Sequence, residues 1–218
     1  MRVTVRALGL LALACMASAS DVRPLFSEDH PANRKAALAL ARQAFDTYCL
    51  QRRTLSLPAV LPDALRLRSA VFVSSMVNGA PRCCMGSLYP TQPSLAREII
   101  ASACAAAAVD WRFAPIRPTE LQRLQLIVSI LAPPESITDP KALDPLVEGV
   151  AVRSAKTTGV ALPGESPHLS RMIEWARVRS GAVAGERVSY FRVRAVRIIE
   201  PPPGRTEASA RPGREEDE

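Results

Sequence analysis

The sequence predicts an α+β fold with a mainly antiparallel sheet flanked by helices. Two patterns support this class: stretches with helical spacing alternate irregularly with β-rich stretches, and a strong hairpin signal joins two neighbouring strands. Size is a third observation, because 218 residues with 48% hydrophobic content suffice for one domain, or for one domain with two lobes around a shared core.

The first nineteen residues have the features of a secretory signal peptide and are not expected to belong to the fold. Arg2 and Arg6 make the start basic, an apolar run follows at 7–16, and small residues at 17–19 suit cleavage. The run is shorter than the roughly 20 residues that a membrane-spanning helix needs. The alternative is a lipoprotein signal ending before Cys15, since "LALAC" approximates a lipobox. Either signal predicts an extracytoplasmic protein, periplasmic or secreted, and the second adds a lipid anchor at Cys15.

Composition divides the remaining chain into three parts. We expect a linker at 20–31, a folded domain at 32–200 and a disordered tail at 201–218. The tail begins with three consecutive prolines, ends in an acidic tip and lacks apolar periodicity, which is typical of disorder.

The first predicted element of the domain is an amphipathic helix from Ala32 to about Cys49. Apolar residues recur there at helical spacing, and charged residues between them can face water. The segment that follows is expected to be a loop, because two prolines interrupt it.

A β-hairpin is predicted next. The stretches 69–77 and 83–88 are β-rich, and the pair Asn78-Gly79 between them is favoured in a two-residue hairpin turn. Cys83 and Cys84 are then neighbours on the returning strand. Because adjacent strand residues point to opposite faces, one of the two faces the core and the other faces solvent or a cleft.

Further elements complete the predicted fold. Ser94 is placed to cap an alanine-rich helix, and a mostly buried strand follows at 124–131. Two short strands joined by a turn, a helix at 168–180 and a closing strand at 186–199 come after it. The alternation of the closing strand slips near Phe191-Arg192, which predicts a β-bulge at that point.

The basic charge of the chain does not indicate a nucleic-acid partner. The formal net charge is +7, but the 28 basic residues include no lysine besides Lys35, Lys141 and Lys156, and no run of five forms a basic tail. An arginine-rich coding bias explains this composition without a phosphate-binding surface. We therefore expect no binding of nucleic acid.

No cofactor or metal site is predicted either. The chain has two histidines, His30 and His168, and neither stands in a Gly-x-Ser-x-Gly or His-Glu-x-x-His context. A Gly-x-Gly-x-x-Gly fingerprint and a P-loop are also missing from the sequence.

Four motifs in the middle of the chain resemble, in order and in spacing, those of the AMMECR domain family. Residues 81–87 read P-R-C-C-M-G-S, where the family has L-R-G-C-I-G-T. Residues 107–113 match its Ala-Ala run followed by Asp-x-Arg-Phe, and residues 128–135 match VSVL-x-x-PE. Residues 148–164 resemble the family's DG-x-x-V … GLLLPQ. The resemblance covers roughly residues 33–199.

The resemblance implies a two-lobed fold in which the strand with the first motif lies near a cleft between the lobes. Cys84 matches the family's cysteine, and Arg82, two residues away on the same predicted strand face, is expected to lower its pKa. These two are the candidate catalytic residues. Candidate ligand-binding residues at the cleft are Gly86, Ser87, Asp110, Arg112 and Phe113. The alternative for the Asp-x-Arg pair is a helix-end turn fixed by an internal ion pair. Family members often occur beside a Memo-like protein and a radical-SAM enzyme, which implies these two as partners.

Departures from the family pattern leave two hypotheses open. Cys83 replaces a glycine, Gly164 replaces a glutamine, and the family's C-x-K-A-G pattern becomes R-V-R-S-G at 177–181, without its cysteine. These losses favour an exported binding or accessory component of a modification pathway. The retained Arg-x-Cys and Asp-x-Arg-Phe favour the alternative, a cysteine-dependent enzyme that acts on a small polar substrate in the cleft.

The oxidation state of the cysteines is also open. In an oxidising compartment Cys49, Cys83, Cys84 and Cys104 allow three disulfide connectivities, of which the one that joins the adjacent pair is geometrically strained. A disulfide at Cys84 would exclude a nucleophile there.

Overall fold

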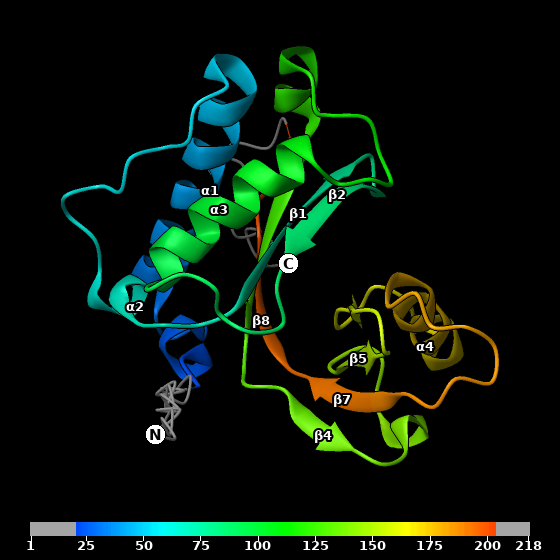
Figure 1. The fold of residues 1–218 in the computed structure, drawn as a ribbon. Coiled ribbons are helices and arrows are strands. Elements are labelled where there is room, and N and C mark those ends of the chain that lie inside the picture. Colours follow the sequence, from blue (N-terminus) through cyan, green and yellow to red (C-terminus); the bar gives the residue numbers. More distant parts are fainter. Residues whose placement is uncertain (1–20, 204–218) are drawn as a thin grey trace, which may run out of the picture.

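Two four-stranded antiparallel sheets form the framework of the protein (Figure 1). The structure is a computed structural model that describes residues 21–203. The strand order is β2-β1-β3-β8 in the first sheet and β4-β7-β5-β6 in the second. The strands are β1 (Val71–Val77), β2 (Ala80–Gly86), β3 (Gln125–Leu131), β4 (Glu135–Ile137), β5 (Gly149–Arg153), β6 (Thr158–Ala161), β7 (Ser189–Val193) and β8 (Ala195–Ile199). The helical segments are η1 (Arg23–Phe26), α1 (Pro31–Gln51), α2 (Asp63–Arg66), α3 (Leu95–Ala108), η2 (Pro118–Arg123), η3 (Pro140–Ala142) and α4 (Leu169–Arg179). The predicted α+β class with antiparallel pairing in two lobes is confirmed.

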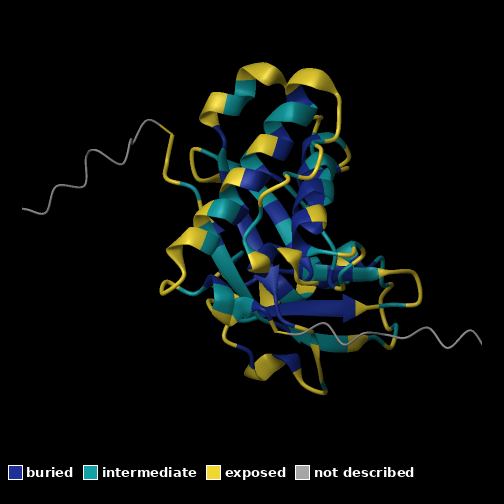
Figure 2. Cartoon of the chain, turned by 90° about the vertical axis from the view of Figure 1, so that its left-hand side faces the viewer, coloured by how far each residue is buried: buried dark blue, intermediate teal, exposed yellow. Residues whose placement is uncertain are grey.

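Helices α1 and α3 cover one face of the first sheet (Figure 1). Small residues on both helices, among them Ala41, Ala44 and Ala103, are fully buried, so the two helices pack closely on each other and on the strands. Ser94 begins α3 as predicted, because its hydroxyl accepts a hydrogen bond from the N–H of Arg97. Figure 2 shows the buried residues gathered along the strands and the inward faces of the helices.

The opposite face of the first sheet looks toward the second sheet. Phe72 and Cys84 pack there against an apolar cluster that includes Leu131, Ala151 and Val193. Because side chains alternate along a strand, the residues on either side of Phe72 belong to the core under α1 and α3 instead. The space between the sheets is therefore lined by the residues that face away from the main core.

The β1–β2 hairpin forms as predicted, with one addition. Asn78 and Gly79 have φ angles of 51° and 79°, the left-handed values that a tight hairpin turn requires. The register then shifts, because Ser75 pairs with Cys83 while Met76 pairs with Pro81. The residue between, Arg82, has no partner on β1 and forms a β-bulge.

The segment predicted as a linker, residues 20–31, is part of the folded domain over the residues that the structure describes. Val22 and Phe26 are buried in the core against α1, at 2% and 0% exposure. Asn33 and Arg34 donate side-chain hydrogen bonds to carbonyl oxygens of the η1 turn. The linker prediction was wrong because it depended on composition, whereas two well-placed apolar residues are enough to dock a short turn.

The predicted closing strand, residues 186–199, is two strands in two different sheets. β7 pairs with β4 and β5, and β8 pairs with β3. The break falls at Arg194, whose carbonyl oxygen accepts from the N–H of Ala132, rather than at the predicted bulge near Phe191-Arg192. The chain thus crosses between the lobes twice side by side, once from β3 toward β4 and once from β7 to β8.

Helix α4 packs on the second sheet beside β6. A Cβ atom at Gly159 would lie 2.1 Å from the carbonyl oxygen of Ala176, so only glycine allows this close approach of helix and strand. Met172 and Ala176 are fully buried at the same interface. This packing fixes the C-terminal end of α4 next to β6.

Two predictions concern residues outside the described part of the chain. The signal peptide at 1–19, with its alternative lipid anchor at Cys15, lies there, and so does the tail from residue 204 onward. Among residues 21–203, no helix combines the length and the apolar character that crossing a membrane requires.

Candidate functional site

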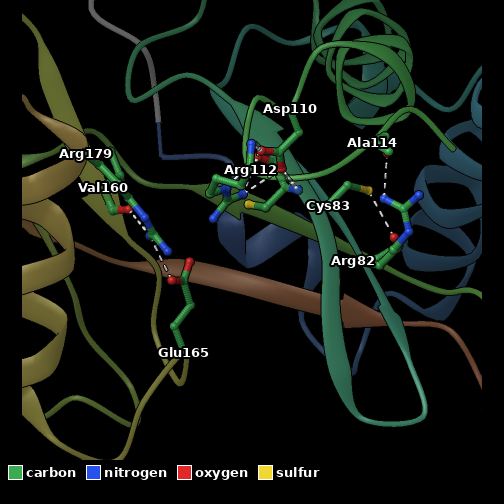
Figure 3. Close-up of polar contacts among 10 residues, drawn as sticks. Arg82, Cys83, Asp110, Arg112, Ala114, Val160, Glu165 and Arg179 are labelled. Atoms are coloured by element: carbon green, nitrogen blue, oxygen red, sulfur yellow. Dashed lines mark hydrogen bonds and ion pairs between the residues drawn. The ribbon is translucent and has the colours of Figure 1, made fainter.

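A cavity of about 420 Å³ lies between the two sheets, beside the strand that carries Cys84. Strands β1, β2 and β6, the turn after α3 and the C-terminal end of α4 all contribute to its wall. The lining residues used below are Phe72, Cys84, Gly86, Ser87, Leu88, Tyr89, Asp110, Trp111, Arg112, Val160, Glu165 and Arg179. Figure 3 shows the polar contacts that organise this region.

The two adjacent cysteines face opposite ways, as predicted. Cys83 is 2% exposed, belongs to the core under α1 and α3, and has its sulfur 3.0 Å from the hydroxyl of Ser75. Cys84 lines the cavity. Burial raises the pKa of the Cys83 thiol to about 12, so this residue is a structural one.

Two side chains from the turn after α3 hold the backbone of Cys84. The strand β2 lies at the edge of its sheet, and the N–H and C=O of Cys84 form no ladder bonds because they point outward. Asp110 Oδ2 accepts from the Cys84 N–H at 2.8 Å, and Arg112 Nη2 donates to the Cys84 carbonyl oxygen at 3.1 Å. The pair thus replaces a neighbouring strand at this position.

Asp110 and Arg112 also bind each other. The Nε and Nη2 atoms of Arg112 donate to the two carboxylate oxygens at 2.9 and 2.7 Å, and the Arg112 backbone N–H donates to Oδ1 at 3.1 Å. Burial acts to raise the pKa of Asp110, but the hydrogen bonds from Arg112 and the Cys84 N–H outweigh it and hold this pKa below its ordinary value. The carboxylate has all four lone-pair positions in use, so Asp110 positions other groups and does not bind a ligand.

A second ion pair stands on the opposite wall, at the end of α4. Arg179 Nη1 donates to Glu165 Oε2 at 2.8 Å and to the carbonyl oxygen of Val160. Figure 3 shows this pair facing the Asp110–Arg112 pair across the cavity. Both arginine side chains are 25% exposed, so each remains in contact with the cavity space.

The Cys84 thiol is protonated at neutral pH. Burial raises its pKa, the nearby Glu165 raises it further, and Ser74, Arg112 and Arg179 offset only part of the increase. No histidine lines the cavity in the described part of the chain, so no imidazole is present to take the proton. The site therefore presents a weakly nucleophilic thiol between two ion pairs.

Arg82, predicted as the partner of Cys84, points elsewhere. Its guanidinium donates to Glu120 at 2.9 Å and to the carbonyl oxygen of Ala114 at 2.9 Å, outside the cavity. Figure 3 shows the contact with Ala114. The β-bulge at Arg82 turns its side chain away from the face that Cys84 occupies. Phe113 is likewise outside the cavity wall, since its ring lies between Arg82 and Arg112 at 5.9 and 5.4 Å. The expected catalytic pair is thus not formed.

Gly86 and Ser87, the remaining predicted residues, line the cavity for structural reasons. A Cβ atom on Gly86 would lie 2.2 Å from the Val71 carbonyl oxygen, so the motif needs glycine at this position. Ser87 donates to the carbonyl oxygen of Tyr89 and contacts the carboxylate of Glu98 at 3.2 Å. Glu98 is 2% exposed and also accepts from two backbone N–H groups of the same loop, so Ser87 belongs to a network that fixes the cavity wall.

Sequence reasoning missed four residues of this site: Tyr89, Trp111, Glu165 and Arg179. Glu165 comes from the turn between β6 and α4, and Arg179 comes from the end of α4, far along the chain from the cysteine motif. A signal for Arg179 existed, because it stands at the lysine position of the family's C-x-K-A-G pattern at 177–181. The pattern lacks the family's cysteine here but keeps a basic residue at the lysine position.

The four cysteines of the described part of the chain are free thiols: Cys49, Cys83, Cys84 and Cys104. Residues 21–203 also contain no cluster of three or more His, Cys, Asp or Glu side chains arranged to hold a metal ion.

Comparison with known proteins assigns this architecture. Two antiparallel sheets with helices and a cavity between them define a two-lobed α+β protein, and the sequence profile of the AMMECR1 family matches residues 38–184. The chain belongs to the AMMECR1 family. It is 36% identical to a protein of Thermotoga maritima over 125 residues, 56% of this chain and 72% of the relative. It is 33% identical to a protein of Methanothermobacter thermautotrophicus over 135 residues, 59% of this chain and 70% of the relative.

A solved structure has the same fold. The crystal structure of the uncharacterised protein PH0010 from Pyrococcus horikoshii superposes with a TM-score of 0.69, covering 77% of this chain and 91% of that one. Sequence identity in this comparison is 24%.

Proposed function

We propose that this protein is a binding domain, an accessory component without its own covalent catalysis, whose inter-sheet cavity takes a small polar ligand. The observation that carries the proposal is the state of Cys84. Its thiol lines the cavity, burial raises its pKa, and no histidine of the described residues lines the cavity to take its proton. The cavity is large enough for a small ligand and is lined by both polar and apolar side chains.

The second candidate is a cysteine-dependent enzyme, and one observation favours it. Arg112 and Arg179 both act to lower the pKa of Cys84, so a ligand or partner that displaced Glu165 would bring the thiol closer to ionisation. No histidine among residues 21–203 lines the cavity to act as the general base, and the Glu165 carboxylate in its wall is paired with Arg179.

Site-resolved alkylation separates these two candidates. The purified protein is treated with iodoacetamide between pH 6 and 10, and peptide mass mapping follows each cysteine in the same sample. A binding domain predicts slow alkylation of Cys84 at pH 7. The rate should climb by about tenfold for each pH unit and should not level off until the pH exceeds 9, the ordinary thiol value. Cys49, Cys83 and Cys104 serve as internal references in the same sample. Alkylation of Cys84 at pH 7 that is rapid while these three react slowly would contradict the proposal.

We further propose that the domain is exported and acts with a Memo-like and a radical-SAM protein in a modification pathway. The family resemblance supports the partners, and the basic and apolar order of the first nineteen residues supports export. Protein isolated from its own host should begin near Ser20, or carry a lipid on Cys15. An intact Met1 in the cytoplasmic fraction would contradict export, and the absence of both partner genes nearby would contradict the pathway.

A further inference from the structure

We infer that the cavity binds a small monocarboxylic acid with a planar body, whose carboxylate lies between Arg112 and Arg179 and whose planar part stacks on Trp111. This inference deepens the proposed binding function and rests on it. It assigns the ligand a chemical class and gives three residues separate roles.

Two arginines of the cavity have hydrogen-bond donors that no protein group uses among residues 21–203. Arg112 uses Nε and Nη2 for Asp110 and Cys84, which leaves its Nη1 group without a hydrogen-bond partner among residues 21–203. Arg179 uses Nη1 for Glu165 and Val160, so its Nε and Nη2 groups lack a partner within the same residues. Both guanidinium groups line the cavity from opposite walls. Two sets of fixed donors that face each other suit an anionic oxygen ligand.

The cavity wall carries no net charge. The charged side chains that line the cavity are Asp110, Arg112, Glu165 and Arg179, which form two neutral pairs around a protonated thiol. Their sum is zero, so a dianion such as a phosphate monoester would bring two uncompensated charges into a partly buried space. A monocarboxylate brings a single negative charge, and the unused arginine donors can form hydrogen bonds with its oxygens. The balance therefore favours a carboxylate over a phosphate.

Two aromatic side chains, Trp111 and Tyr89, form part of the cavity lining. Trp111 lines the cavity yet is 79% exposed, which is unusual for a large aromatic residue. Tyr89, the other aromatic residue at the rim, is 45% exposed and has the Arg153 guanidinium 5.7 Å from its ring. The Trp111 ring has no such neighbour among the aromatic and cation–π contacts of the described chain. This exposed ring lines the same cavity as the apolar side chains of Phe72 and Leu88, which suits a planar group.

Titration calorimetry with four defined probes tests this class. Benzoate carries the carboxylate and the ring, benzamide is its neutral counterpart, benzylamine reverses the charge, and phenyl phosphate at pH 8 is a dianion. We expect benzoate to bind with a Kd of about 1 mM or tighter. Benzamide should bind roughly tenfold more weakly or worse, because the charge-assisted hydrogen bonds are lost.

Matched variants test the assigned residues. Trp111→Ala should raise the Kd for benzoate about fivefold, because the ring stacking is lost. Val109→Ala, an exposed apolar residue of the same turn that does not line the cavity, should leave it unchanged. Arg179→Gln should raise the Kd for benzoate roughly tenfold, because the charge-assisted hydrogen bonds to the carboxylate are lost. Arg177→Gln, on the same helix but outside the cavity wall, is its control.

The outcomes separate the ligand class from the proposed function. Trp111-dependent binding of benzamide, benzylamine or phenyl phosphate in preference to benzoate would overturn the carboxylate class and leave a binding domain. If benzoate did not bind even at a concentration of about ten times the expected Kd, the carboxylate class would be overturned as well. Rapid alkylation of Cys84 at pH 7 would instead overturn the proposed function, whatever the probes do.

Discussion

The carboxylate of Asp110 accepts a hydrogen bond of 2.8 Å from the backbone N–H of Cys84, at the exposed edge of the first sheet. This contact joins two of the four sequence motifs that carry the family resemblance, through residues that are 26 positions apart. Its role is to fix the strand edge rather than to take part in chemistry, because Asp110 has no lone pair left for a substrate. The same arrangement explains why Asp-x-Arg is needed as a unit: Arg112 binds the carbonyl oxygen of the same residue.

Replacement of Asp110 by asparagine should lower the free energy of unfolding by about 2 kcal/mol. The amide cannot accept both Arg112 donors and the Cys84 N–H, so a buried network loses its central acceptor. Urea denaturation measures the change. Asp21→Asn is the matched control, since Asp21 forms a similar pair with Arg23 at the surface and should cost less than about 0.5 kcal/mol. Equal losses in the two variants would contradict the assigned role of Asp110.

The same network predicts a pH dependence. The folded-state pKa of Asp110 lies below its ordinary value of 3.8. A depressed pKa contributes stability that is fully present above pH 3.8 and is lost as the pH falls through the lower folded value. The difference in unfolding free energy between wild type and Asp110→Asn should therefore be constant from pH 5 to 7 and shrink below pH 4. A difference that grew toward acid pH would contradict this sign.

The two cysteines should respond differently to truncation. Cys83→Ala removes a fully buried sulfur and its contact with Ser75, so it should cost about 1 kcal/mol. Cys84→Ala should change stability by less than about 0.5 kcal/mol, because the backbone of Cys84 keeps its bonds to Asp110 and Arg112. Reversed values in urea denaturation would mean that the strand register is shifted by one residue. Equal and large losses would indicate disulfides, which non-reducing mass analysis detects as missing thiols.

The sequence predicts that the side chains of Cys83 and Cys84 point to opposite faces of the sheet. It does not predict which residues surround them. Asn78-Gly79 fixes the hairpin turn, and strand alternation then separates Cys83 from Cys84. The bulge at Arg82 has no local sequence signal, because it results from how β2 meets β1 and from the bonds to Glu120. Without the bulge, simple alternation would have placed Arg82 beside Cys84.

Longer-range relationships were hidden for a similar reason. Arg179 and Glu165 reach the cavity through the packing of the second sheet against the first, which no local pattern encodes. The break at Arg194 also follows from this arrangement, because the strand must leave one sheet and enter the other. Local turn and capping signals were therefore reliable, and contacts between the lobes were not.

The corrected role of Arg82 leads to a kinetic prediction. Arg82→Gln should leave the pH profile of Cys84 alkylation unchanged, since Arg82 binds Glu120 outside the cavity. Arg179→Gln should move the profile to higher pH, because it removes a cation that lowers the thiol pKa and frees Glu165, which raises it. Site-resolved iodoacetamide labelling of the two variants measures both effects. A shift in Arg82→Gln equal to that in Arg179→Gln would restore the original pairing of Arg82 with Cys84.

Two C-terminal truncations should divide the folded domain from its tail. Glu200 follows β8 directly, and its carboxylate binds Arg42 of α1 and accepts from the N–H of Leu126. A chain ending at Pro203 keeps these bonds and should melt within a degree or two of full length. A chain ending at Ile199 loses them and leaves the half-buried Arg42 guanidinium without its main partner. For a domain of this size, the expected loss of about 1 kcal/mol or more should lower the melting temperature by about 2–4 °C or more. Scanning calorimetry measures both. If the two truncated chains melted together, Glu200 would not anchor the end of the domain, and the boundary would lie before β8 ends.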